Sequence, residues 1–321
     1  MRAVVVTTPG TAELVEVARP QPGPGEVRVQ VTAAGICGTD RRLAARGADP
    51  PRIPGHEVAG RLDDGTPVGV HPDVGCGRCR HCLAGLENRC PDRTPVGLDR
   101  DGGLAEWLCV PAAHAVPVAG LDLRLVPLLE PLACCLHALS NFVVRRGDAA
   151  LVVGAGSMGL LCMWALQAAG ATVAVAQRSP ERRALAARLG ADVVLGPGQD
   201  PQAELGRAPS VAVVAAPGSE PLAWALAKVA VGGRVHAFAS TPGGAPVDAN
   251  VVHYRHLTVI GSTGSTVGDY RRARDLTASG EVPLARLPRT TVPLERAPAV
   301  LLGRDGLGAL KITVDVEGTS Q

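Results

Sequence analysis

The sequence predicts an α/β fold in which a parallel sheet, covered by helices on both faces, follows a part built from short strands and loops. The length of 321 residues fits two domains better than one. After residue 148 strand and helix patterns alternate, as they do where helices connect parallel strands. A glycine-rich turn, GAGSMG at 154–159, separates the first of these strands from its helix.

The composition is that of a compact protein without a nucleic-acid-binding surface. Hydrophobic residues make up 46% of the chain and charged residues 19%, so the chain can bury a sizeable core. The 32 basic and 30 acidic residues leave a net charge of +2, and aromatic residues amount to 2%. Because both a basic footprint and base-stacking side chains are missing, nucleic acid is not an expected partner.

The expected elements follow the chain in two groups. Residues 1–35 have the pattern of short strands separated by Pro/Gly turns, 36–120 are rich in loops, and 127–144 are helical. In the alternating part, helices are expected at 158–169, 180–189, 220–229 and 267–279. The strands around them are expected in LVVGAG, ATVAVA, ADVVL, SVAVVAAPG, GGRVHAFAS and HLTVIGS. A final helix and strand are expected within 290–316.

The segment 149–177 carries no charge and is long enough to imitate a membrane span. Its glycine turn, a further glycine at 170 and the β-branched run TVAV fit a strand, a buried helix and a second strand better, so no membrane association is expected. The N-terminal MRAVVVTTPG lacks an apolar segment with a cleavage site, so no signal peptide is expected. Thiols placed for metal binding suit the reducing cytoplasm.

The glycine turn is the first candidate binding site. Gly154 permits the tight turn, Gly156 lets the backbone approach a pyrophosphate, and Gly159 lets the helix pack closely on the sheet. Ser157 and Met158 begin a helix whose N-terminus favours phosphate charge. The strand before the turn and the helix after it predict a Rossmann-type dinucleotide site, although a ligand-free glycine turn is the alternative.

The end of the second strand bears on which dinucleotide is bound. An acid at this position would bind the ribose 2′-hydroxyl of NAD, but this chain has Gln177. Arg178 follows directly and Arg182 one turn later, and a guanidinium can bind a 2′-phosphate through two hydrogen bonds. NADP is therefore favoured over NAD, with a merely solvated arginine face as the alternative.

A cluster of cysteines predicts a first metal site. Four cysteines within fifteen positions, with two short spacings and one of seven, suit a closed, structural zinc site rather than a disulfide framework; they are Cys76, Cys79, Cys82 and Cys90. His81 is then a surface residue, because four thiolates already complete the coordination. A nucleic-acid-binding zinc ribbon is the rival interpretation, and the near-neutral charge argues against it.

A second set of residues suits a zinc site with an open position. Cys37 lies in GICGTD with Thr39 two residues on, His56 lies beside Glu57 in PGHE, and Glu130 opens EPLACC. A thiolate, an imidazole and a carboxylate make three ligands and leave room for water or substrate. Each residue alone has a structural explanation, and only the joint pattern together with the dinucleotide turn favours a catalytic metal.

These motifs together resemble the zinc-dependent medium-chain dehydrogenases/reductases of the alcohol dehydrogenase superfamily. The similarity is greatest to the branch of polyol, sorbitol and threonine dehydrogenases, and GICGTD, GHE, the four-cysteine lobe, EPLACCLHA, GAGSMG and the terminal LKITV carry it. It implies a GroES-like β-barrel catalytic domain at 1–135 with a structural zinc lobe at 76–90, an inserted Rossmann domain at 136–261, and a C-terminal return to the catalytic domain at 262–321. The family's active site lies in the cleft between domains.

The resemblance also implies roles for individual residues. Cys37 and His56 map onto catalytic zinc ligands, and Glu57 and Glu130 onto glutamates that bind zinc directly or through water. It implies two zinc ions per chain and a homo-oligomer, either a dimer or a tetramer. Many relatives have a histidine three residues after the relay Ser/Thr, where this chain has Arg42, which cannot shuttle protons as imidazole does.

The expected activity is hydride transfer between a secondary alcohol, such as a polyol, sugar or cyclitol, and NAD(P). Zinc lowers the pKa of a bound alcohol, and Thr39 carries the hydroxyl proton away. Two alternatives remain open: a zinc-free quinone or enoyl reductase of the same fold, and a non-catalytic dinucleotide- or zinc-binding regulator.

Overall fold

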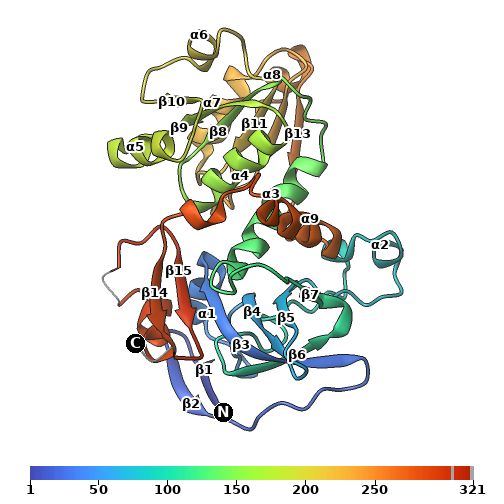
Figure 1. Ribbon diagram of the computed structural model, residues 1–321. Coiled ribbons are helices and arrows are strands. Elements are labelled where there is room, and N and C mark those ends of the chain that lie inside the picture. Colours follow the sequence, from blue (N-terminus) through green and yellow to red (C-terminus); the bar gives the residue numbers. More distant parts are fainter. Residues whose placement is uncertain (305–306, 319–321) are drawn as a thin grey trace. The chain divides into compact units, whose positions relative to one another are not determined.

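The structure, a computed structural model, describes residues 1–304 and 307–318 (Figure 1). The chain divides into two compact units. The first comprises Met1–Ala133, Ser265–Ala278 and the chain from Pro288 onward, and the second comprises Cys134–Gly264 and Ser279–Leu287. The sequence predicted domain boundaries after residues 135 and 261, and these stay a prediction. That prediction assigned Ser279–Leu287 to the C-terminal return, whereas these residues belong to the second compact unit.

The first unit is built on an antiparallel sheet that joins both ends of the chain. In spatial order its strands are β14 (Thr290–Pro293), β15 (Ile312–Asp315), β3 (Glu26–Ile36), β4 (Glu57–Leu62), β5 (Pro67–Val70) and β7 (Ala115–Pro117), and β6 (Trp107–Pro111) also pairs with β3. Within this sheet β14 and β15 pair in parallel, and the other described strand pairs are antiparallel. The C-terminal β15 thus lies directly beside β3, on the side opposite β4.

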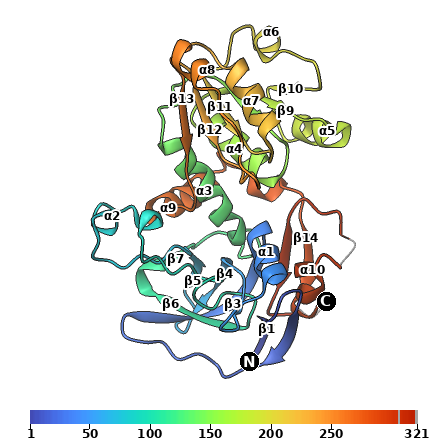
Figure 2. The ribbon, with the colours of Figure 1, turned by 180° about the vertical axis from the view of Figure 1, so that it is seen from behind.

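Shorter elements surround this sheet. The strands β1 (Arg2–Val6) and β2 (Ala12–Glu16) form a hairpin, and α10 (Ala297–Leu301) packs on β2 and on α1 (Gly38–Arg46) (Figure 2). The other helices are α2 (Arg80–Leu83) and α9 (Val267–Ala278), while α3 (Leu129–Ser140) begins in the first unit and continues into the second. Valines of β3, β4, β5 and β15 form the core, so residues from both ends of the chain share it.

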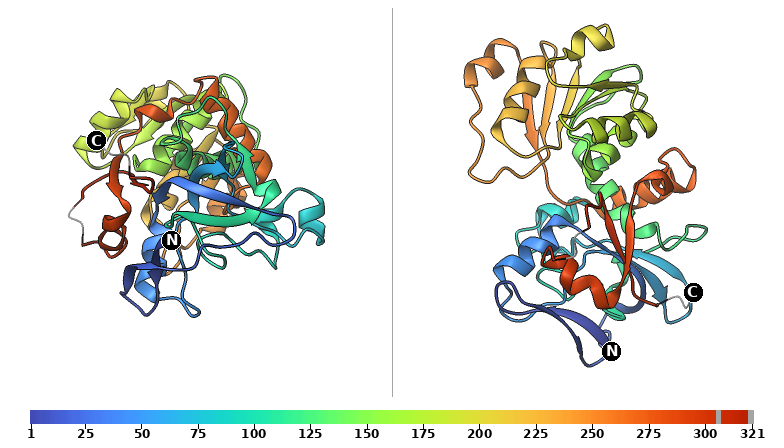
Figure 3. Two further views of the ribbon diagram at one scale, coloured as in Figure 1. Left: turned by 60° about the horizontal axis from the view of Figure 1, so that its bottom comes forward. Right: turned by 90° about the vertical axis from the view of Figure 1, so that its left-hand side faces the viewer.

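The second unit is a doubly wound sheet of six parallel strands. Their order is β10 (Val193–Leu195), β9 (Thr172–Ala176), β8 (Ala149–Val153), β11 (Val211–Val214), β12 (Arg234–Ala237) and β13 (Thr258–Gly261). The helices α4 (Ser157–Ala168) and α5 (Pro180–Arg188) cover one face, and α7 (Ser219–Lys228) and α8 (Ala249–Tyr254) cover the other (Figure 3). A short helix, α6 (Pro201–Leu205), follows β10. This arrangement confirms the predicted fold class.

The sequence patterns located the long elements and missed several short ones. The helix α1 falls in a segment expected to be loop, because GTDRRLAAR buries only Asp40, Leu43 and Ala44 and so shows little apolar periodicity. Capping explains it: Cys37 accepts the amide N–H of Thr39, and Asp40 accepts that of Cys37. No helix in the described part of the chain combines the length and apolarity that a membrane crossing needs, including α4 in the uncharged segment.

One buried histidine of the second unit makes its stability depend on pH. His236 of β12 is fully buried beside the rings of Phe142 and Phe238, and its Nε2 lies 3.0 Å from Ser262 Oγ. Burial, with a smaller contribution from His137, lowers the pKa of His236 from 6.5 to about 4. Between these two pH values the unfolded chain binds a proton that the folded chain does not, so stability falls as the pH falls.

We therefore expect His236→Gln to reduce the acid sensitivity of the fold. Between pH 7.5 and pH 5 the parent protein should lose about 2 kcal/mol more free energy of unfolding than the variant, because only its folded state excludes that proton. Denaturant titrations at both pH values measure the difference. Equal losses in the two proteins would show that His236 is not held neutral.

Candidate metal and cofactor sites

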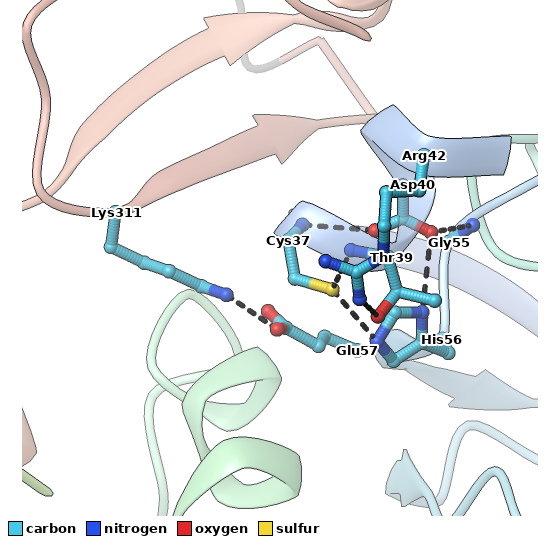
Figure 4. Close-up of polar contacts among 8 residues, drawn as sticks. All are labelled: Cys37, Thr39, Asp40, Arg42, Gly55, His56, Glu57 and Lys311. Carbon is cyan, nitrogen blue, oxygen red and sulfur yellow. Dashed lines mark hydrogen bonds and ion pairs between the residues drawn. The ribbon is translucent and has the colours of Figure 1, made fainter. Parts of the chain in front are cut away.

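The first candidate site lies where β3 ends and α1 begins. Cys37 is the residue between them, and its Sγ accepts the amide N–H of Thr39 at 3.1 Å. His56 precedes β4, the neighbour of β3, and its Nε2 lies 3.1 Å from Cys37 Sγ (Figure 4). The strand pairing thus brings together two ligand types that are 19 positions apart in the sequence.

Asp40, which the sequence analysis did not single out, fixes this pair. Its carboxylate is fully buried and accepts the amide N–H groups of Cys37 at 2.9 Å and Gly55 at 3.1 Å, and it lies 3.2 Å from His56 Nδ1. With Nδ1–H donated to Asp40, Nε2 faces Cys37 as a free ligand atom. The capping pattern of α1 was the sequence signal that could have identified Asp40.

The charges of this cluster shift its pKa values in opposite directions. Burial alone would raise the pKa of Asp40, but His56 and the donated N–H groups lower it. Burial alone would lower the pKa of His56, but Asp40 and Cys37 raise it well above its ordinary value. The surrounding negative groups therefore favour a cation between Cys37 Sγ and His56 Nε2.

Glu57 reaches the same pocket across a glycine. In the sheet register Gly35 of β3 is paired with Glu57 of β4 on one side and with Thr313 of β15 on the other. A Cβ atom on Gly35 would lie 1.8 Å from Glu57 Oε2, so only glycine leaves space for this side chain. Glu57 Oε1 forms an ion pair with Lys311, and Oε2 is buried with no hydrogen-bond partner in the described part of the chain.

Lys311 is the second residue that the sequence analysis missed. It is 6% exposed and precedes β15, so its partner Glu57 is 254 positions away. Burial alone would lower the pKa of Lys311, but Glu57 and Cys37 raise it above its ordinary value. The chain has only two lysines, and the position of this one within the apolar run ALKITV was a usable signal.

Glu130 and Tyr270 complete the surroundings. Glu130 lies in the first turn of α3 and is buried, and one of its carboxylate oxygens lies within 4.8 Å of ligand atoms of His56 and Glu57. Tyr270 of α9 is fully buried, and its hydroxyl has no hydrogen-bond partner among the residues described. Burial and the charges of Glu130 and Glu57 raise its pKa, so it stays a neutral donor.

This donor set fits a divalent metal ion. Cys37, His56 and the two glutamates offer the thiolate, imidazole and carboxylate ligands that zinc accepts in sites with an open position. The unpartnered Glu57 Oε2 is a buried polar atom of the kind that a ligand or metal normally satisfies. The ligand atoms form two overlapping groups, each within 4.8 Å: Cys37 with Asp40 and His56, and His56 with Glu57 and Glu130.

Thr39 and Arg42 lie at the edge of this cluster. Arg42 is exposed and its Nη2 donates to Thr39 Oγ1 at 2.9 Å (Figure 4). Because the guanidinium has no acceptor, Thr39 oxygen accepts this bond and its own hydrogen remains available for another partner.

The four lobe cysteines also lie together. Their Sγ atoms are all within 4.8 Å of one another, and those of Cys79 and Cys82 are 3.6 Å apart. Zinc–sulfur bonds of about 2.3 Å in a tetrahedron give sulfur–sulfur edges of about 3.8 Å. Backbone N–H groups of Arg78 and Cys79 lower the pKa of Cys76 to about 6, which favours the thiolate that metal binding needs. None of the nine cysteines, all of which lie in the described part of the chain, forms a disulfide bond.

The glycine turn of the second unit has the geometry of a phosphate-binding turn. Gly154 has a φ of 107°, and its N–H donates to Ala176 at the end of β9. A Cβ on Gly159 would lie 1.9 Å from the Gly154 carbonyl oxygen, so close packing of α4 requires glycine there. A Cβ on Gly156 would meet nothing within 4 Å, so this turn is open at the N-terminus of α4, where Ser157 and Met158 lie.

At the end of β9 the arginines differ in their contacts. Gln177 Oε1 accepts the amide N–H groups of Arg178 and Ser179, so its side chain is turned toward its own backbone. Arg183, which the sequence analysis had not chosen, donates to the carbonyl groups of residues 177 and 178. Arg178 and Arg182 are exposed, which leaves their guanidinium groups accessible to an anion.

Comparison with known proteins assigns the family. Residues 23–120 match the family described as alcohol dehydrogenase GroES-like domain, and residues 157–279 match zinc-binding dehydrogenase. L-galactonate-5-dehydrogenase of Escherichia coli K12 is 32% identical over 82% of this chain and 83% of its own length. L-threonine 3-dehydrogenase of Pyrococcus horikoshii is 34% identical over the same shares. The chain belongs to the zinc-type alcohol dehydrogenase family.

Solved structures of this family have the same fold over nearly the whole chain. An alcohol dehydrogenase from Escherichia coli CFT073 complexed with NADH has a TM-score of 0.90 at 28% identity, covering 98% of this chain and 99% of that one. A putative zinc-binding dehydrogenase from Sinorhizobium meliloti 1021 bound to NADP has a TM-score of 0.89 at 30% identity with the same coverage. The family resemblance and fold class predicted from the sequence are confirmed.

For this dehydrogenase we expect Gly35→Ala to be destabilising. The added methyl group would collide with Glu57 Oε2 in a buried site, at a cost of about 1–3 kcal/mol. The matched control is Gly308→Ala, where a Cβ meets nothing within 4 Å and φ is not left-handed. Thermal unfolding of both variants tests this; Gly35→Ala as stable as Gly308→Ala would contradict the packing.

Proposed function

We propose that this zinc-type dehydrogenase interconverts a secondary alcohol of a small, hydroxyl-rich molecule with the corresponding ketone, using NAD(P). The observation that carries the proposal is the pair of overlapping donor groups on the first unit, in which His56 lies near Cys37 on one side and near Glu57 and Glu130 on the other. The second unit of the same chain bears a glycine turn at the N-terminus of α4. When bound, zinc supplies a Lewis acid that polarises the substrate oxygen, and the nicotinamide supplies a hydride acceptor.

The chain's own residues bind and orient these groups. Cys37 and His56 hold the metal, and Asp40 keeps His56 in the tautomer that presents Nε2. In oxidation the substrate hydroxyl would give up its proton, while a bound nicotinamide would supply the acceptor for the hydride of the carbinol carbon. Thr39 Oγ1 accepts that proton as it passes its own hydrogen on toward solvent, with Arg42 fixing the position of Oγ1.

The names of the relatives support the substrate class. They place the reaction at carbon 5 of L-galactonate and carbon 3 of L-threonine, each a secondary alcohol in a small polar molecule. A spectrophotometric assay of nicotinamide reduction with polyols, sugar acids and hydroxy amino acids tests the proposal. Turnover of at least one secondary alcohol supports it, and a complete lack of turnover across the panel in zinc-loaded protein contradicts it.

The proposal includes two zinc ions per chain, one bound by Cys37, His56 and a glutamate and one by the four lobe cysteines. Their sulfur spacing, the lowered pKa of Cys76 and the free thiols support a closed structural site. Free thiols also suit a cytoplasmic location. A homo-oligomer belongs to the same proposal, and light scattering of the purified protein measures its size.

We expect the two zinc sites to respond differently to substitution. Cys76→Ala should lose one zinc and unfold at lower temperature, because closed zinc sites contribute directly to folding free energy. Cys37→Ser should lose the other zinc, retain its fold and lose turnover by at least about a thousandfold. Elemental analysis and thermal unfolding measure both effects.

The half-buried Cys109 lies outside both sites, so Cys109→Ala is the matched control and should keep both zinc ions. At most one zinc in fully loaded parent protein, or normal turnover of Cys37→Ser, would contradict the assignment.

We further propose a preference for NADP over NAD. No carboxylate follows β9 directly, and the exposed guanidinium groups of Arg178 and Arg182 can reach a 2′-phosphate there. Relatives of known structure bind either dinucleotide, one NADH and one NADP. The preference therefore depends on these residues rather than on the family.

We expect Arg178→Ala to raise the KM for NADP by about tenfold to a hundredfold and to leave that for NAD nearly unchanged. A charge-assisted hydrogen bond of about 1.5–3 kcal/mol gives this range. Arg188→Ala, at the C-terminal end of α5, is the matched control and should leave both constants unchanged, because Arg178 lies just before the opposite end of that helix. A kcat/KM for NAD at least equal to that for NADP in the parent protein would refute the preference.

A further inference from the structure

Two carboxylates from the segment that forms the cysteine lobe bind the point where the chain re-enters the first unit. The first unit resumes at Ser265, two residues before α9 begins at Val267. The amide N–H of Ser265 donates to Asp73 Oδ2 at 3.0 Å, and that of Val267 donates to Glu87 Oε1 at 2.5 Å. These contacts join residues 192 and 180 positions apart, and they place α9 beside the lobe (Figure 1, Figure 2).

The lobe determines where these two carboxylates lie. Each precedes a lobe cysteine by three residues: Asp73 precedes Cys76, and Glu87 precedes Cys90. Between Asp73 and Cys76 the backbone passes directly under the lobe at Gly75. A Cβ atom on Gly75 would lie 2.6 Å from Cys82 Sγ and 3.0 Å from Glu87 Cβ. The sulfur atoms of the lobe and both carboxylate-bearing segments are therefore packed as one group.

Arg93, which follows the lobe, joins the same two segments. Its Nη1 lies 3.0 Å from Asp73 Oδ1 and donates to the carbonyl oxygen of Asn88, the neighbour of Glu87, at 3.1 Å. One guanidinium thus connects the segment before the lobe with the segment that ends it. A metal bound by the four thiolates would fix the same two segments from the other side.

The start of α9 in turn fixes the position of Tyr270. This side chain lies three residues after Val267 and is fully buried. Its ring meets the ring of His71 edge-on, with the ring centroids 6.0 Å apart and the planes at 76°. His71 Nε2 donates to the carbonyl oxygen of Ser265 at 3.0 Å. Ser265 is therefore bound through its N–H by Asp73 and through its carbonyl by the histidine that packs on Tyr270.

The hydroxyl of Tyr270 lies on the face of the sheet that carries Glu57. A Cβ atom on Gly69 of β5 would lie 2.3 Å from this hydroxyl oxygen, so the hydroxyl covers the glycine. Gly69 is paired with Ala59 of β4, and Ala59 shares a face with Glu57, two residues before it. The contacts at the start of α9 therefore determine whether a neutral hydroxyl stays on the face that bears the proposed metal site.

We propose that Asp73 and Glu87 are positioning residues through which the metal of the cysteine lobe fixes the start of α9 and, with it, Tyr270. This inference rests on the proposed zinc of the lobe and deepens it, because it gives the lobe an effect on the catalytic face as well as on folding. The first amide groups of a helix lack intrahelical acceptors and favour negative charge, so a carboxylate suits this position.

Glu87→Ala tests the proposal without removing a metal ligand. The variant should keep the zinc content of the parent, while the amide of Val267 exchanges with deuterium about tenfold to a hundredfold faster, because a charge-assisted hydrogen bond is lost. Fluorine NMR of protein labelled with 3-fluorotyrosine gives a second signal, since the chain has two tyrosines and Tyr254 is exposed. The Tyr270 resonance should shift in Glu87→Ala, and the Tyr254 resonance should not.

Two variants serve as controls. Glu87→Gln retains an oxygen that can accept the N–H of Val267, and it should match the parent in exchange rate and fluorine spectrum. Asp92→Ala removes an exposed carboxylate just after the lobe and should also match the parent. Cys82→Ala, which lacks a lobe ligand, should lose one zinc and reproduce both changes of Glu87→Ala. If Cys82→Ala fails to fold, Glu87→Ala alone decides.

The proposal is overturned if Glu87→Ala matches the parent in both signals, or if Asp92→Ala changes them as much as Glu87→Ala does. Loss of zinc from Glu87→Ala would also overturn it, because the side chain would then act on the metal and not through α9. A parent protein that loses no zinc on Cys82→Ala substitution contradicts the proposed lobe site itself, whatever the state of α9.

Discussion

The burial of negative charge beside the end of β3 is the constraint on which the first unit depends. Two groups of acidic or thiol side chains meet at His56, Cys37 with Asp40 and Glu57 with Glu130, and all of them except Cys37 are buried. Such groups remain ionised only where cations or N–H donors compensate them. Asp40 has three N–H donors and one oxygen of Glu57 has Lys311, while the second oxygen of Glu57 has no hydrogen-bond partner among the described residues, which fits a bound divalent cation.

The sheet register satisfies this constraint from segments far apart in the chain. The strand β3 carries Cys37 at its end and Gly35 within it, β4 brings His56 and Glu57, and β15 brings Lys311 from near the C-terminus. A slip of one residue would turn Glu57 or Lys311 to the opposite face and leave its partner buried and unpaired. The C-terminal return of the chain into the first unit is therefore part of the site and does more than complete the sheet.

The sequence predicted a site correctly in kind where the residues that form it lie close together along the chain. The spacing of Cys76 to Cys90 and the glycines of 154–159 are local motifs, because one lobe and one turn contain all their contacts. Asp40 and α1 escaped notice because a polar capping pattern shows no apolar periodicity. Lys311 could not be assigned to Glu57 from the sequence, since their contact follows from strand pairing across 254 positions. The bonds of Gln177 to the amide of Arg178 and of Arg183 to the Gln177 carbonyl are local, but the sequence does not tell which of the neighbouring arginines makes the backbone contact.

Anomalous X-ray diffraction from crystals of the zinc-loaded protein, recorded above and below the zinc absorption edge, tests the central claim most directly. The account predicts one peak within the four-cysteine lobe and a second beside Cys37 Sγ and His56 Nε2. Crystals that show the lobe peak but no zinc beside Cys37 and His56 would contradict it.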